Sequence, residues 1–122
     1  MRYLIQFCLF FLYVHFSQAQ MGVDTNTEIK FSAQVMLHDA TEIEYSSLET
    51  DLNANPYVFM VRLDRITNGL FIITQNVATF DETVFNGWIG ERTHLIECYR
   101  DGIHGMVEIL PFTSNFCNAI SE

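Results

Sequence analysis

The stretch THLIECYRDGIHGMVEILPF, residues Thr93–Phe112, alternates apolar and polar side chains on both sides of Asp101-Gly102. A period of two is typical of a β-strand, and Asp-Gly readily takes the positive φ angles of a two-residue type I′ turn. The stretch therefore predicts a β-hairpin. With the loop at these two residues, Tyr99 lies opposite His104 on the solvated face, and Cys98 lies on the buried face.

Strand patterns recur before this hairpin. Glu28–His38 alternates apolar and polar residues, as a half-buried strand does. Tyr57–Leu63 is apolar on both faces, which favours a central strand. Asn68-Gly69 then predicts a turn into a further strand over Leu70–Ala78.

The remaining segments carry weaker signals. The acidic stretch Asp39–Asn55 reads as a loop that holds either a short strand or one capped helical turn beginning at Ser47. Val84-Phe85 predicts another short strand, followed by a bend that holds Trp88. Six or seven short strands without an amphipathic helix predict an all-β domain. We expect a small antiparallel β-sandwich, jelly-roll or immunoglobulin-like, or a partly open barrel.

The first nineteen residues have the pattern of a secretory signal peptide. Arg2 precedes an apolar run, and Ser17-Gln18-Ala19 offers small residues at both positions that a signal peptidase reads. The alternative is a membrane anchor, but the apolar run is shorter than the ~20 residues a spanning helix needs. We therefore expect a signal peptide over 1–19, a single secreted domain over 20–122, and no membrane span after cleavage.

The charge balance excludes some partners. Beyond residue 19 the chain has five basic side chains against fifteen acidic ones, a net charge of −10. Such a chain repels phosphate backbones and anionic membrane surfaces. We therefore expect no nucleic-acid partner, and an extracellular ligand or protein instead.

Two cysteines remain after the predicted cleavage. Cys8 lies in the signal segment, so Cys98 and Cys117 are the pair left for an oxidising compartment. A disulfide between them is the default expectation there. Two free thiols, or a bond between chains, are the alternatives.

One set of residues suggests copper. Cys98, His104 and Met106 resemble the C-terminal ligand loop of cupredoxin-like domains, with His38 or His94 as the second imidazole. The predicted hairpin argues against this, because it puts the thiol and His104 on opposite faces. Cys117 also offers the thiol a simpler partner.

Other chemistry finds no support. The chain has no Gly-x-Ser-x-Gly elbow, no calcium loop pattern and no glycine-rich phosphate loop. The acids of 39–51 read as a solvated loop. We therefore expect no catalytic residues, no metal and no cofactor.

Aromatic residues near glycines and polar groups indicate a binding surface. Tyr99 beside His104, with Trp88 near a glycine bend, is a mixture typical of sugar- or lipid-binding sites. These three residues are the predicted ligand-binding set, although packing into a core is the default role of large aromatics.

Several segments resemble, in order, the domain named after farnesoic acid O-methyltransferase, which occurs in secreted invertebrate proteins. They are a strand leading into a His-Asp-Ala segment, a Tyr-led strand with an Asn-containing turn, a Phe-rich segment with Trp-Ile, and a late strand: Phe31–Ile43, Tyr57–Val61 with Asn68, Phe85–Ile89 and Leu95–Arg100. The family's Ile-Gly-Gly-Trp and final tryptophan segment are absent. The resemblance implies a β-sandwich module. The methyltransferase activity in its name does not transfer, because the chain lacks a nucleotide-type cofactor loop.

The sequence thus predicts a small secreted acidic domain with one disulfide that binds a carbohydrate, lipid or protein ligand without catalysis. The alternative is a structural extracellular protein that forms a homo-oligomer and thereby covers its edge strands. A copper protein is the remote alternative.

Overall fold

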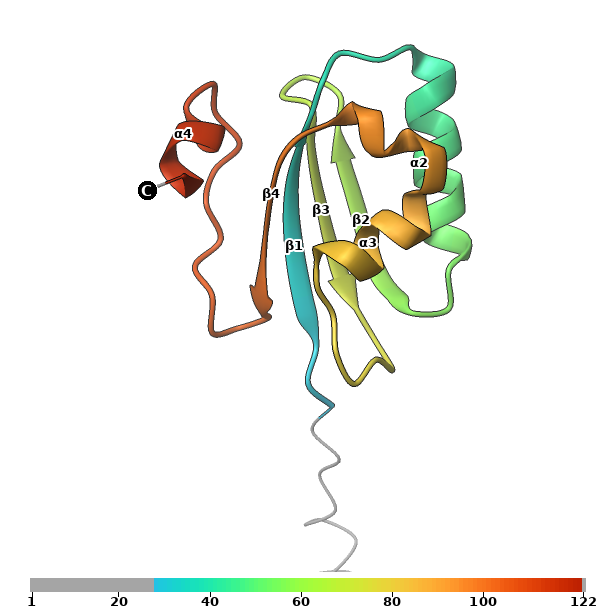
Figure 1. Cartoon of the computed structure of the whole chain (residues 1–122), viewed down its shortest axis with the longest axis vertical. Helices are drawn as coiled ribbons and strands as arrows, with labels where there is room; N and C mark the ends of the chain where they lie inside the picture. Colours follow the sequence, from blue (N-terminus) through green and yellow to red (C-terminus); the bar gives the residue numbers. More distant parts are fainter. Residues whose placement is uncertain (1–27, 122) are drawn as a thin grey trace, which may run out of the picture.

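The computed structural model describes residues 28–121, so the predicted signal peptide lies outside the described residues. Four strands and two longer helices make up most of this part (Figure 1). In chain order they are β1 (Phe31–Leu37), α2 (Glu42–Ala54), β2 (Val58–Asp64), β3 (Gly69–Thr74), α3 (Glu82–Ile89), the 3-10 helix η1 (Gly90–Leu95), β4 (Ile96–Ile103) and the short α4 (Phe116–Ile120).

The strands form one antiparallel sheet in the order β2-β3-β1-β4. Together with the βαββαβ order of elements, this is the ferredoxin-like, or split βαβ, arrangement. α2 and α3 lie on one side of the sheet, whereas the C-terminal segment and α4 lie on the other (Figure 1). The antiparallel sheet predicted from the sequence is therefore present. The sheet is open, and helices rather than a second sheet form the layer that packs on it.

The predicted hairpin at Asp101-Gly102 is wrong. Both residues lie inside β4, where Asp101 pairs with Ala33 and Gly102 pairs with Ser32 of β1. The chain turns later, where the N–H groups of Met106 and Val107 donate to the carbonyl of Ile103. A long-range strand pairing has overridden the local turn preference.

Gly102 allows Val107 to approach the strand closely and does not form a turn. A Cβ built on it would lie 2.8 Å from the Cβ of Val107, which packs on this strand after the chain has turned. Any larger residue would push Val107 away. The glycine that looked like a turn signal is therefore a packing position.

The sequence predicted α2 only as one alternative, a single capped turn beginning at Ser47, and it did not predict α3. α2 begins with a capping box, in which the Thr41 hydroxyl accepts from the Glu44 N–H and the Glu44 carboxylate accepts from the Thr41 N–H. α3 begins at Asp81, whose carboxylate accepts from the Val84 N–H at 2.9 Å. The short strand predicted at Val84-Phe85 is therefore wrong, because these residues lie in α3.

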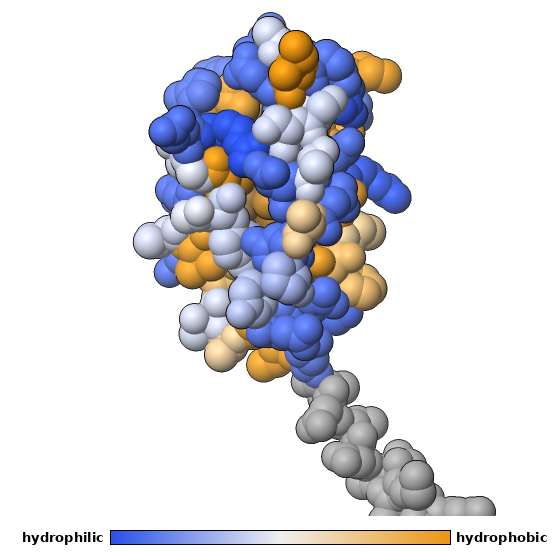
Figure 2. Space-filling model, turned by 90° about the vertical axis from the view of Figure 1, so that its right-hand side faces the viewer, coloured by the Kyte–Doolittle hydropathy of each residue, from blue (hydrophilic) through white to orange (hydrophobic). Residues whose placement is uncertain are grey.

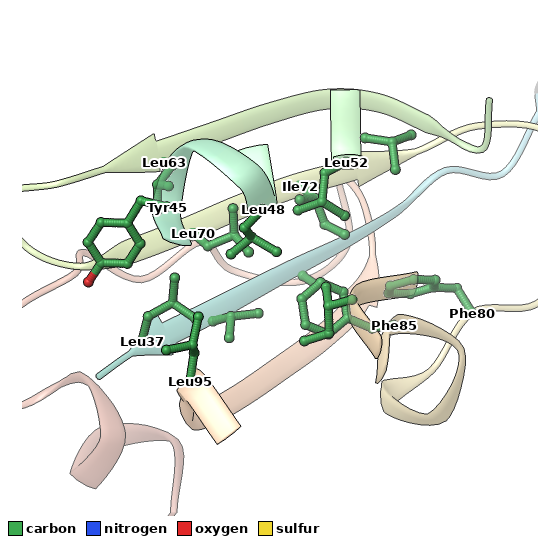
Figure 3. Packing of buried hydrophobic residues seen from close by; sticks show 14 residues of the cluster. Leu37, Tyr45, Leu48, Leu52, Leu63, Leu70, Ile72, Phe80, Phe85 and Leu95 are labelled. Atoms are coloured by element: carbon green, nitrogen blue, oxygen red, sulfur yellow. The ribbon is translucent and has the colours of Figure 1, made fainter. Parts of the chain in front are cut away.

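The hydrophobic core fills the space between the sheet and these helices. Tyr45, Leu48 and Leu52 lie on one side of α2 and point toward the strands (Figure 3). The sheet contributes the side chains that alternate toward the helices. The strand and α3 members of this core are Ala33, Val35, Leu37, Val58, Leu63, Leu70, Ile72, Phe85 and Ile89.

The β2–β3 hairpin is confirmed, although its turn lies over 65–68, Gly69 already belongs to β3, and β3 ends at Thr74 rather than at Ala78. The Asp64 carboxylate accepts hydrogen bonds from the N–H groups of Ile66 at 2.8 Å and Thr67 at 3.4 Å. The bond from Ile66 is the main reason that the pKa of Asp64 lies below its ordinary value of 3.8. The carboxylate therefore holds the turn in place.

Acidification should release this turn. Because the pKa of Asp64 is lower in the folded chain, its contribution to stability is full above pH 3.8 and is lost as the pH falls through the folded value. Asp64→Asn keeps an acceptor but cannot titrate. We expect urea unfolding of this variant to depend less on pH between about 4 and 2 than that of the parent. Equal pH dependence in both proteins would contradict this role.

The last part of the chain, residues 107–121, crosses the sheet face that the helices leave open, and we call it the strap. The Gln34 side chain, which is 3% exposed, donates to the Leu110 carbonyl at 2.6 Å and accepts from the Leu110 N–H at 3.0 Å. Farther along, a Cβ on Gly69 would fall inside the ring of Phe112. The strap thus runs diagonally from the end of β4 over β1 to the start of β3.

A disulfide holds the far end of the strap. The Sγ atoms of Cys98 and Cys117 are 2.05 Å apart, and the two Cα atoms are 5.7 Å apart. Phe116 next to it is 1% exposed, and its ring packs 5.0 Å from that of Phe112. The pair of cysteines predicted from the sequence is the pair that the structure joins.

Candidate binding surface

The sheet face opposite the helices is covered unevenly. The strap lies over β1 and β4 and reaches β3 only at Gly69, where Phe112 sits. The edge strand β2 and the rest of β3 are less covered, although Ile73 on this face is buried. The side chains left there form the open strip, which we define as Lys30, Phe59, Met60, Arg62 and Phe71.

The register puts these side chains next to one another. Arg62 pairs directly with Phe71, so both side chains project from the same face. The register shifts between Val58 and Met60, and Phe59 lies at this bulge. The Lys30 ammonium reaches across to Phe59 and lies 3.5 Å from the centre of its ring.

Apolar surface is exposed in the open strip. Phe59 is 56% exposed, and Met60 and Phe71 are half-buried. Arg62 is exposed at the edge of these side chains. Aromatic, methionine and arginine side chains together are the composition enriched at protein interfaces.

The strip is also the cationic part of an acidic molecule. Arg65 pairs with Glu42 and Glu49, and Arg92 pairs with Asp51, so both are neutralised. Within 28–121, Lys30 and Arg62 form no ion pair. An anionic group would therefore find two available cations here.

The remaining cation, Arg100 on β4, contacts the strap. The Arg100 guanidinium donates to the carbonyl of Glu108 and to the side chain of Gln34 at 3.2 Å. It therefore holds the strap in place.

The side of the molecule where α2 lies is mostly hydrophilic with scattered apolar residues (Figure 2).

A pocket of about 430 Å³ lies at the far end of the strap. The β2–β3 turn, the strap and the end of β1 line it, with Ile66, Asn68, Phe112, Ser114 and Met36 among the contributors. Its lining mixes apolar and hydroxyl or amide groups, and Glu97 is the charged residue among them. The pocket is adjacent to the disulfide through Cys117.

The predicted ligand-binding residues lie elsewhere. Trp88 is on α3, half-buried, with its ring 5.2 Å from that of Phe80. His104 is exposed just beyond β4, and its N–H donates to the Lys30 carbonyl. Neither belongs to the open strip, and a ligand role for them stays a prediction.

Tyr99, the third member of that set, packs in the helical layer. Its ring lies 5.4 Å from that of Phe85, and its hydroxyl donates to the Asp101 carboxylate at 2.6 Å. Burial, reinforced by this carboxylate, raises the pKa of Tyr99 well above its usual range. Because β4 continues past residue 101, Tyr99 does not face His104 as the predicted hairpin required.

The copper arrangement does not form around Cys98, because its sulfur is bonded to Cys117. Met106 is 82% exposed on the turn after β4. No group of three potential metal-ligating side chains occurs among residues 28–121. The predicted acidic loop is largely helix α2, on which Glu42 is exposed and Glu44 and Glu49 are half-buried.

The open strip was missed because β2 was read as a central strand. β2 lies at the edge of the sheet. Pro56 before it and the charged Arg62 and Asp64 at alternate positions are typical of edge strands, and these signals were present in the sequence.

No family model matches this chain, and no curated protein and no solved structure matches it significantly. The resemblance to the farnesoic acid O-methyltransferase-like domain thus stays a prediction. In the described part of the chain, no helix is long and apolar enough to cross a membrane. The ferredoxin-like arrangement itself identifies no activity, because folds of this kind support many unrelated functions.

Proposed function

We propose that this protein is a small secreted binding module, without catalysis, that recognises an anionic segment of an extracellular protein through its open strip. The observation that carries the proposal is the strip itself. Exposed Phe59 and half-buried Met60 and Phe71 lie beside Arg62 and Lys30, two cations without acidic partners in the described structure.

The charge distribution supports an anionic partner. The chain as a whole is strongly acidic, so a basic ligand would be attracted to many places on its surface. An acidic ligand is repelled everywhere except near unpaired cations. The open strip would therefore select its partner by charge as well as by apolar contact.

The disulfide supports an extracellular location. Bonds of this kind persist in oxidising compartments and are rare in the cytosol. The predicted signal peptide over 1–19 agrees with this location. The Cys98–Cys117 bond fixes the strap, and the strap in turn limits how much of the sheet face is free for a partner.

A structural homo-oligomer is the second candidate, favoured by the single strand neighbour of β2. A second copy added along β2 would bring together two α2 helices, because α2 packs against β2. Each α2 carries Glu42, Glu44, Glu49 and Asp51. Like charges at close range oppose such a pairing.

The test is selection from a random displayed-peptide library on the immobilised, oxidised protein. We expect the enriched peptides to be rich in Asp and Glu, and we expect Arg62→Gln to weaken a selected peptide about tenfold, as the loss of one charge-assisted contact does. Phe59→Ala should also weaken it.

The matched control is Arg65→Gln, which removes an arginine that is already paired with Glu42 and Glu49. Its affinity for the peptide should stay within about twofold. Peptides that bind the Arg62 and Arg65 variants equally, or a library that yields no binder, would refute the proposed function.

A further inference from the structure

The hydrogen bonds of the sheet show which backbone groups of β2 point outward. The Leu37 N–H of β1 donates to the Asn68 carbonyl at 2.8 Å, so the backbone groups of Asn68 point toward β1. Antiparallel strands alternate the direction of their backbone groups. Leu70 and Ile72 therefore also bond to β1, whereas Phe71 bonds to β2.

The same alternation shows which backbone groups of β2 lie at the free edge of the sheet. Arg62 lies opposite Phe71 and uses its N–H and C=O groups toward β3. The backbone groups of Val61 and Leu63 consequently point away from β3, at the outer edge of the sheet. The side chains of these two residues face the helices, since Leu63 is buried in the core and Val61 packs against it.

An incoming strand would continue this pattern. Its alternate side chains would fall on the strip face, beside Arg62 and Met60, and on the helix face, beside Val61 and Leu63. The first set meets a cation, so carboxylates fit there. The second set meets apolar side chains, so apolar residues fit there.

The edge also carries features that oppose pairing with other strands. The bulge near Phe59 interrupts the regular ladder, and Arg62 and Asp64 put charges on the strand. Such devices keep edges from pairing nonspecifically. An acidic partner converts the Arg62 charge from a barrier into an attraction, so the same residue gives specificity.

We infer that the partner binds as a fifth strand along β2, through an extended segment with alternating acidic and apolar residues. This inference rests on the proposed function and adds the partner's conformation to it. The bonding edge is Val61 and Leu63, and the strip-facing contact is Arg62. This mode of recognition gives affinity through main-chain hydrogen bonds and specificity through alternate side chains.

The probe is the blocked peptide acetyl-Glu-Val-Glu-Val-Glu-Val-Glu-amide, with a Lys-for-Glu peptide as control. We expect the Glu peptide to bind at least about tenfold more tightly, and its affinity to fall as salt is raised. Two further peptides carry backbone N-methyl groups, one on the Val residues and the other on the Glu residues. Only one of these sets of N–H groups points toward β2, so only one methylated peptide should lose binding.

Hydrogen exchange gives the second readout. On peptide binding, the Val61 and Leu63 amides should gain protection, while the Arg62 amide, already bonded to β3, should not change. Binding that tolerates both methylated peptides, or that both abolish equally, would overturn strand addition, as would unchanged exchange at Val61 and Leu63.

The two proposals fail separately. If a peptide depends on Arg62 but does not protect the edge amides, the strip binds it and the fifth strand is wrong. If no acidic peptide depends on Arg62, the proposed function fails first. A dimer in sedimentation that protects Val61 and Leu63 without peptide would show that a second copy occupies the edge, and would overturn the inference.

Discussion

Phe85→Ala should lower the free energy of unfolding by about 3–5 kcal/mol, the cost of removing a large aromatic ring from a packed core. Phe85 is fully buried on α3, and its ring packs against that of Tyr99 on β4. The cavity would lie between helix and sheet, where neighbouring side chains are held by both layers (Figure 3). Because small domains are stable by only about 5–15 kcal/mol, the loss is a large fraction of the total. Urea unfolding followed by circular dichroism measures it.

The matched control is Thr83→Ala on the same helix. Thr83 is exposed, and substitutions at such surface positions usually change stability by less than about 0.5 kcal/mol. If Phe85→Ala proved as mild as the control, α3 could not pack on the sheet as described.

Opening the disulfide should cost about 3 kcal/mol, by the chain-entropy estimate for a loop of this size. Cys98 and Cys117 are 19 residues apart in sequence, and the bond pins the strap to β4. The Cys98→Ser/Cys117→Ser double variant should therefore unfold at lower urea concentration, with hydrogen exchange in the strap rising more than exchange in β1 and β3.

The substitutions should loosen the strap but not the core, and this difference makes the prediction specific. The core between the sheet and helices α2 and α3 does not depend on the strap, so the far-ultraviolet spectrum should be retained. Full unfolding of the double variant, or unchanged exchange at Leu110, would contradict the described role of the bond. Chemical reduction of the parent protein should reproduce the effect of the substitutions.

The alternation in Glu28–His38 predicted the strand β1 correctly, because the period of two is visible in the residues. The strand is buried on both faces rather than half-buried, since the strap covers the face opposite α2 and α3. The β2–β3 hairpin was also predicted, since its turn is local and Asn68 takes a positive φ of 62°. Both features depend on neighbours in sequence. The cysteine pair was predicted because two cysteines lie beyond the predicted signal peptide.

Two of the missed features depend on distant parts of the chain, whereas the capping box of α2 is a local signal that the sequence carried. Asp101-Gly102 has the composition of a turn, but β1 supplies a partner strand along its whole length. α2 buries only Tyr45, Leu48 and Leu52 among polar residues, a stripe too narrow to stand out in an acidic segment. The candidate binding surface could be found only from the strand order, because the position of β2 at an edge leaves Phe59 and Arg62 exposed.

The path of the strap links oxidation of Cys98 and Cys117 to the pairing of the strands beneath it. The strap contacts Gln34 on β1 and Gly69 on β3, so it can settle only after these two strands have paired. We therefore expect the native bond to close after the sheet has paired, and a chain with a misregistered sheet to keep free thiols. If the protein is exported, as we propose, thiol-dependent retention would hold back such chains, and closure of the Cys98–Cys117 bond would mark a correctly paired sheet.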